Sequence, residues 1–150
     1  MSTFKANLND ISKLDKNIKI AMVVWNFNSL YTLEIEKQNR ELFTKKWFNN
    51  VDTFVVPWAF ELPGFAKKLI EKNTYELIIV LWVVIRWDTP HFDYVCENAA
   101  SWTMELNLKY STPVIFWVLT CENDEQVIAR INDWFAISWL NLLSEIQKIK

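Results

Sequence analysis

The chain has 150 residues, of which 51% are hydrophobic, and its 16 basic and 18 acidic residues leave a net charge of −2. Charges of both signs are interspersed, which argues against a nucleic-acid or membrane-surface partner held by bulk charge. No apolar run reaches the ~18 residues of a membrane span, and the N-terminus lacks the pattern of a signal peptide. We therefore expect one compact cytoplasmic domain that takes small-molecule ligands.

The first predicted elements are a strand, a loop and a helix. The apolar run IKIAMVV over residues 18–24 predicts a buried strand, and polar residues after it indicate a loop at 25–29. Helical apolar spacing follows over 30–46 and ends in two lysines, which suit the negative end of a helix dipole. Trp47 then stands where a capping glycine is expected.

The same alternation of strands and helices continues to the end of the chain. Residues 75–85, YELIIVLWVVI, form an almost unbroken apolar run, which is typical of a central parallel strand covered on both faces. The other predicted elements are a strand at 52–56, a helix ending at Lys72, a helix at 92–109, a strand at 113–119 and helices at 123–132 and 135–148.

This order predicts right-handed βαβ units around a four-stranded parallel sheet, an α/β fold of three layers, α/β/α. Ligands of such folds bind where loops leave the carboxyl ends of the strands. The loops of interest are 25–29, 57–61, 86–91 and 120–123.

The chain's single histidine, His91, follows the third predicted strand within IRWDTPHFDY. A lone histidine is more often a surface or core residue than a catalyst, although its ordinary pKa near 6.5 suits proton transfer. Its place beside Arg86, Asp88 and Thr89 in a carboxyl-end loop makes anion binding and proton transfer the hypothesis for this segment.

Aromatic residues also sit at the carboxyl-end loops. Phe27 and Phe60 are either lids of the core or a stacking platform for a flat heterocycle, whose edge Glu61 or backbone groups would bind. Arg130 taken alone is typical of a solvated helix surface. Cys96 and Cys121 lack metal-ligand spacing and are expected to be packed thiols rather than a disulfide.

The balance of tryptophan and glycine is abnormal. The chain has nine tryptophans and one glycine, whereas ordinary usage of about 7% predicts roughly ten glycines. No phosphate-binding, dinucleotide-binding or serine-hydrolase motif occurs, even when glycine is read in place of tryptophan.

Four segments together resemble the lumazine synthase family of riboflavin biosynthesis. They are VVWNFN, VVPWAFELP, LWVVIRWDTPHFDYVC and TPVIFWVLTCENDEQVIAR, in the family's order and spacing over residues 18–131. The resemblance implies a flavodoxin-like domain at 18–150 after an N-terminal extension at 1–17. It also implies condensation of 5-amino-6-(D-ribitylamino)uracil with 3,4-dihydroxy-2-butanone 4-phosphate, with no metal or organic cofactor.

The resemblance assigns roles to individual residues. His91 is implied as the proton-transfer group and Phe27 as the residue that stacks on the pyrimidine. The other implied substrate contacts are Ala59, Phe60, Glu61, Val83, Val84 and Ile85, with Phe116 contributed by a neighbouring subunit. The implied phosphate ligands are Asp88, Thr89 and Arg130. The residues after Arg130 lack the lysine-containing segment of many members, and Asn26 replaces a frequent arginine, so we expect weaker phosphate binding.

Family members assemble as pentamers, and some build shells of twelve pentamers, between which the sequence does not choose. Riboflavin synthase is a further partner that the resemblance suggests. Residues 1–17 would add a strand to a neighbour's sheet or form a tail. The alternatives in function are a non-catalytic shell-forming homologue and a flavin-binding module, the latter suggested by fold alone.

Tryptophan stands at positions where the family commonly carries glycine. These are Trp25, Trp47, Trp58, Trp82, Trp87 and Trp117, with Trp102 and Trp139 as further candidates and Trp134 less clearly aligned. Our hypothesis is that the gene uses a code in which UGA specifies glycine, and that UGA was translated here as tryptophan. The alternative is a genuinely tryptophan-rich variant.

Overall fold

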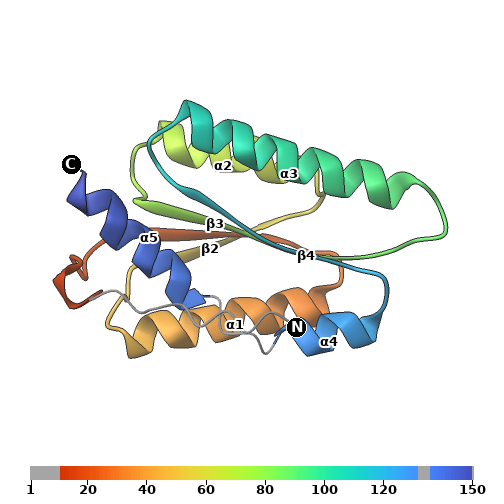
Figure 1. Ribbon diagram of the computed structural model, residues 1–150, viewed down its shortest axis with the longest axis horizontal. Helices are drawn as coiled ribbons and strands as arrows, with labels where there is room; N and C mark the ends of the chain where they lie inside the picture. The colour runs from red at the N-terminus through yellow and green to blue at the C-terminus, as the bar shows by residue number, and fades with distance from the viewer. Residues whose placement is uncertain (1–10, 132–135, 150) are drawn as a thin grey trace.

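The computed structural model describes residues 11–131 and 136–149. Its centre is a parallel sheet of four strands in the order β2-β1-β3-β4 (Figure 1). The strands are β1 (Ile20–Trp25), β2 (Val51–Val56), β3 (Leu77–Ile85) and β4 (Val114–Cys121). The predicted parallel sheet is confirmed.

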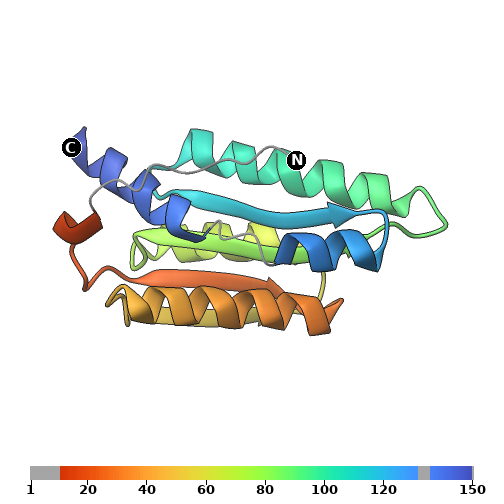
Figure 2. The ribbon, with the colours of Figure 1, turned by 60° about the horizontal axis from the view of Figure 1, so that its bottom comes forward.

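Helices cover both faces of this sheet, so the predicted three-layer α/β/α architecture is confirmed (Figures 1 and 2). One face carries α2 (Glu61–Glu71) and α3 (His91–Lys109). The other carries α1 (Ser29–Lys45), α4 (Asp124–Ile131) and α5 (Ala136–Lys148), and a short 3-10 helix, η1 (Ile11–Lys13), precedes β1. Within the described residues, no helix has the length and hydropathy needed to cross a bilayer.

Strand β3 supplies side chains to both hydrophobic cores. Leu77, Ile79, Leu81 and Val83 point toward α1, α4 and α5, whereas the residues between them point toward α2 and α3. Every residue from Leu77 to Val84 is buried. Alternate side chains of a strand face opposite sides of a sheet, so an unbroken apolar run is the sequence pattern that this position requires.

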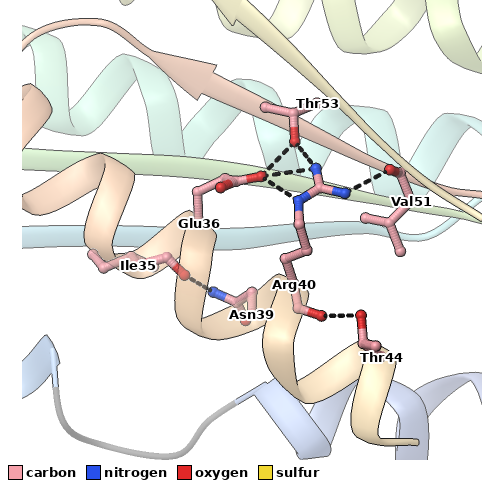
Figure 3. Close-up of polar contacts among 7 residues, drawn as sticks. All are labelled: Ile35, Glu36, Asn39, Arg40, Thr44, Val51 and Thr53. Carbon is pink, nitrogen blue, oxygen red and sulfur yellow. Dashed lines mark hydrogen bonds and ion pairs between the residues drawn. The ribbon is translucent and has the colours of Figure 1, made fainter. Parts of the chain in front are cut away.

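A polar cluster fixes α1 against the edge strand β2 (Figure 3). Arg40 donates hydrogen bonds from Nη1 to the Val51 carbonyl over 3.0 Å and from Nη2 to Glu36 Oε1 over 2.8 Å. The Thr53 hydroxyl lies 2.6 Å from the same Glu36 oxygen. Because the pair is partly exposed, we attribute to it positioning of the helix more than stability.

The outer edge of β2 is only partly covered. Asn50 and Val56 direct their carbonyls to β1, so the alternating residues Val51, Thr53 and Val55 direct their backbone groups away from the sheet. The outward carbonyl of Val51 accepts a hydrogen bond from the Arg40 side chain. Among the described residues β2 pairs with β1 alone, which leaves the rest of this edge open to another strand.

Helix α1 ends in a motif that normally uses glycine. The Phe48 N–H donates to the Phe43 carbonyl over 2.9 Å and the Trp47 N–H to the Thr44 carbonyl over 3.0 Å, which are the two hydrogen bonds of a Schellman motif. Trp47 has a φ of 68°, in the left-handed region. Its ring is 75% exposed, so side-chain burial does not offset the backbone strain.

Replacing Trp47 by glycine is expected to raise the free energy of unfolding by about 1 kcal/mol, because glycine adopts the left-handed conformation without strain. Chemical denaturation of the chain as printed and of the Trp47→Gly variant measures this difference. Trp47→Ala is the matched control, since it removes the ring and keeps Cβ. Equal stability of the glycine and alanine variants would contradict the explanation.

Candidate active site

A cavity of about 300 Å³ opens at the carboxyl ends of β1, β2 and β3, on the side of the sheet that α2 and α3 cover. Its lining is mostly aromatic, as in many small-molecule sites. The lining residues are Trp25, Phe27, Trp58, Ala59, Phe60, Trp87, Thr89, His91 and Val95. Five of the site residues predicted from sequence are among them: Phe27, Ala59, Phe60, Thr89 and His91.

The loop after β1 presents Phe27 at the cavity. The ring of Phe27 is 45% exposed and stacks on Trp25, with centroids 4.8 Å apart and planes 20° apart. Asn28 adopts a left-handed φ of 50° and donates a side-chain hydrogen bond to the Val83 carbonyl over 2.9 Å. This bond attaches the Phe27 loop to the end of β3.

The loop after β2 brings Ala59 and Phe60 to the cavity at the start of α2. Ala59 is buried, whereas Phe60 is half exposed. The Glu61 carboxylate accepts a hydrogen bond from the Trp58 backbone N–H over 3.1 Å, and the Glu61 N–H donates back to the Trp58 carbonyl over 3.2 Å. The expectation that Glu61 binds the edge of a heterocycle meets this competing role, since one of its oxygens holds the loop that precedes α2.

His91 is the first residue of α3 rather than a loop residue, which corrects the predicted loop by one position. Its imidazole lies parallel to the Trp87 indole, with ring centroids 5.3 Å apart and planes 20° apart. The Phe60 ring lies 6.5 Å away, centroid to centroid. The indole therefore covers one face of the imidazole, while the side chain still borders the cavity.

Arg86 is engaged by two carboxylates and is not the free cation that its place beside Asp88 and Thr89 suggested. Its Nε donates to Glu122 over 2.7 Å and its Nη1 to Asp93 over 3.1 Å. The hydrogen bond to Glu122, followed by that to Asp93, raises the pKa of Arg86 against the opposing effect of desolvation. Arg86 thus ties the ends of β3 and β4 to the start of α3. Its positive charge is offset by the two carboxylates, so it offers little attraction to an anionic ligand.

The three residues at the end of β3 that are predicted to contact the substrate differ in how far they are exposed. Val83 and Val84 are fully buried on opposite faces of the sheet, and Ile85 is half buried. Their side chains belong to the two cores. Any contact of Val83 or Val84 with a ligand therefore falls on main-chain atoms.

Two of the predicted site residues that do not line the cavity, Phe116 and Arg130, are also remote from it. Phe116 pairs with Val80 in the amino-terminal half of β4 and is 37% exposed. Arg130 is exposed in the last turn of α4, which covers the opposite face of the sheet. Asp88 is exposed beside the lining residue Thr89. Within a single subunit, the two remote residues do not reach the aromatic cavity.

Sequence reasoning missed two residues that shape the site. Val95 lines the cavity one helical turn after His91, a spacing that would have placed it on the same face of α3. Asn28 is one of the polar residues that predict the loop at 25–29. Asparagine is among the few residues that tolerate a left-handed backbone, which is the signal for its structural role. Within the described part of the chain, no group of three acidic, histidine or cysteine residues could hold a metal ion.

The sequence is similar to proteins of one known family. The profile of the family described as 6,7-dimethyl-8-ribityllumazine synthase matches residues 17–137. A protein of Limosilactobacillus reuteri (strain DSM 20016), named 6,7-dimethyl-8-ribityllumazine synthase, is 39% identical over 115 residues. That alignment covers 77% of this chain and 76% of the relative.

Neither cysteine offers a reactive thiolate near the cavity. Cys96 and Cys121 are separate free thiols, as predicted. Burial, with a smaller effect of Asp93, raises the pKa of Cys96 from 9.0 to about 11. The thiolate is the nucleophilic form, so raising the pKa lowers the reactivity at neutral pH.

Alkylation of Cys96 by iodoacetamide at pH 8 is therefore expected to run about a hundredfold more slowly than that of an ordinary thiol, because the shift from 9.0 to about 11 lowers the thiolate fraction by that factor. The rate should rise as the pH approaches 11. Mass spectrometry of the labelled peptide measures it, with the denatured chain as control. Equal rates in the folded and denatured chains at pH 8 would contradict this account.

Proposed function

This chain belongs to the 6,7-dimethyl-8-ribityllumazine synthase family, and from that membership we propose how its residues carry out the family's reaction. It is a transferase of riboflavin biosynthesis that condenses 5-amino-6-(D-ribitylamino)uracil with 3,4-dihydroxy-2-butanone 4-phosphate. The observation that carries the residue assignment is the aromatic cavity, where two loops and the start of α3 place Phe27, Phe60 and His91 around one space.

We propose that the pyrimidine ring stacks on Phe27. A flat heterocycle gains from an offset aromatic partner, and the Phe27 ring is half exposed at the mouth of the cavity. Ala59 and Phe60 border the same space. The ribityl chain would run along main-chain groups at the end of β3, because the side chains of Val83 and Val84 are occupied in the cores.

In the proposed reaction the amine of the uracil attacks the ketone, and loss of water gives an imine. A proton then leaves carbon 3 of the butanone, phosphate is expelled from carbon 4, and the resulting enol tautomerises to a new carbonyl at carbon 3. Attack of the ribitylamino nitrogen on this carbonyl, with loss of a second water, closes the ring. These steps move protons among carbon, nitrogen and oxygen. His91 is the chain's only histidine and borders the cavity, so it is our candidate for the proton carrier.

We assign the phosphate to Asp88, Thr89 and Arg130. Since Arg86 is neutralised by Glu122 and Asp93, Arg130 is the better source of positive charge. Arg130 lies close enough to the carboxyl end of β4 to lower the pKa of Cys121, which burial raises. The exposed positions of Arg130 and Phe116 outside the aromatic cavity support a site completed by residues of neighbouring subunits.

Members of this family act on small molecules as oligomers, and we propose a pentamer or a shell of pentamers for this chain. Exposed apolar residues one turn apart on α3, Met104 and Leu108, support an interface there. The open edge of β2 supports the proposed strand addition by the N-terminal extension at 1–17. Residues 1–10 lie outside the described chain, whereas Leu14 is buried in the core of its own subunit. Riboflavin synthase is a proposed partner, and separate thiols suit a cytoplasmic location.

Replacing His91 by alanine is expected to lower kcat about a hundredfold, because proton transfer by a positioned side chain contributes at least that factor. Product fluorescence measures the rate after mixing with both substrates. Size-exclusion chromatography should show an unchanged oligomer. Glu97→Ala, an exposed change on the same helix, is the control and should leave kcat unaltered.

The same assay separates the proposed enzyme from its alternatives. A non-catalytic shell-forming homologue or a flavin-binding module would give no lumazine from the two substrates. An unchanged kcat in the His91→Ala variant would instead remove His91 from its assigned role and leave the enzyme assignment intact.

Replacing Arg130 by glutamine is expected to raise KM for the butanone phosphate about tenfold, since hydrogen bonds to a charged phosphate contribute more than neutral ones. KM for the uracil substrate should stay unchanged. Arg130→Lys keeps the charge without the bidentate geometry. Its KM for the butanone phosphate should lie between the values of the unchanged protein and of the Arg130→Gln variant. Steady-state kinetics at constant ionic strength tests this, and equal KM values in all three proteins would refute the assignment.

A further inference from the structure

We propose that the native polypeptide carries glycine, not tryptophan, at eight positions that lie at the end of α1, around the cavity, within strands β3 and β4, and within helices α3 and α5. These are positions where the family that the sequence resembles commonly carries glycine, and the proposal does not depend on the residue roles proposed above. The positions are 25, 47, 58, 82, 87 and 117, together with 102 and 139. Trp134 lies outside the described residues.

Position 47 requires glycine on backbone grounds alone. Both hydrogen bonds of a Schellman motif are formed around it, and its φ of 68° is the conformation in which Cβ is strained. The buried pair Phe43 and Phe48 supplies the hydrophobic contact that accompanies this motif. The helix end is thus built for a glycine that the printed sequence lacks.

The chain's one glycine shows the opposite mismatch. Gly64 lies within α2, where an added Cβ would meet no atom within 4 Å. A residue of almost any kind would fit there, and glycine is a poor helix former. Glycine is therefore present where the backbone does not need it and missing where the backbone does.

Position 82 carries a ring in the most crowded part of the sheet. Trp82 lies within β3, is 1% exposed and is the largest fully buried side chain among the described residues. Its indole N–H has no hydrogen-bond acceptor within the described chain. Buried donors in native proteins almost always have a partner, so this unpaired N–H argues against tryptophan in the native polypeptide.

Positions 25 and 87 fill the cavity with indole rings. Trp25 stacks on Phe27 and Trp87 stacks on His91, so each ring covers a face of a side chain that borders the cavity. Glycine at both positions would uncover the phenyl and imidazole faces and enlarge the space between them. The backbone at 87 would then be open to close approach by a ligand.

One event explains all of these positions together. If UGA specifies glycine in the source of the gene, translation of UGA as tryptophan converts each such glycine and spares those with ordinary glycine codons. Gly64 is then a position with an ordinary codon. Independent mutation would instead have to introduce the same bulky residue at the helix end, in the central strand and in the cavity.

The gene and the native protein test the proposal directly. We expect UGA at each of the eight positions, and an intact mass of the natively produced protein that is lower by one tryptophan-to-glycine difference for every UGA codon. Peptide mapping assigns each difference to its position. A UGG codon at any of the eight positions, or a native mass equal to that of the printed sequence, overturns the proposal.

A folding measurement gives a second readout that needs no substrate. Chains with glycine at all eight positions, or with glycine at seven of them and alanine at position 47 as the matched control, are produced in a host that reads the standard code. The glycine chain is expected to assemble into the same oligomer as the native protein and to unfold at the same temperature, whereas the alanine chain unfolds earlier. A native protein that differs from the glycine chain in both oligomeric state and unfolding temperature overturns the proposal. This result does not depend on whether either protein is catalytically active.

Discussion

Strand β3 has no solvent-facing side, and this two-sided burial organises the rest of the molecule. This strand and its neighbour β1 supply buried side chains both to the core against α1, α4 and α5 and to the core against α2 and α3. Because the strands are parallel, their carboxyl ends meet at one edge. The loop from Arg86 to His91 therefore emerges beside the loops that carry Phe27 and Phe60, although these segments are distant in sequence.

The polar side chains at and near the cavity form two groups, those that hold the fold together and those that border the space where a ligand would bind. Arg86, Glu61 and Asn28 serve the scaffold, because each forms hydrogen bonds that fix a loop or a strand end. His91 and Thr89 border the open space. The arrangement gives one titratable side chain a defined place among aromatic walls, a setting in which positioning of two substrates contributes much of the rate.

Much of the fold was predictable from local patterns, since each strand is an apolar run and each helix has a periodic face; the observed ends differ by only one or two residues. The pairing of Arg86 with Glu122 was not predictable, because these residues are 36 positions apart in the sequence and come together only in the folded sheet. The role of Glu61 could have been found from its spacing to Trp58. The proposal that a neighbouring subunit completes the site came from the family resemblance, because the pattern of one sequence does not indicate which exposed residues face a second subunit.

The uncovered stretch of β2 has a consequence for how the protein is made. Within the described chain the outward backbone groups of Thr53 and Val55 have no partner strand, and such an edge can pair with any extended chain that it meets during synthesis. Slow synthesis at low temperature would therefore favour yield of folded chains over insoluble material.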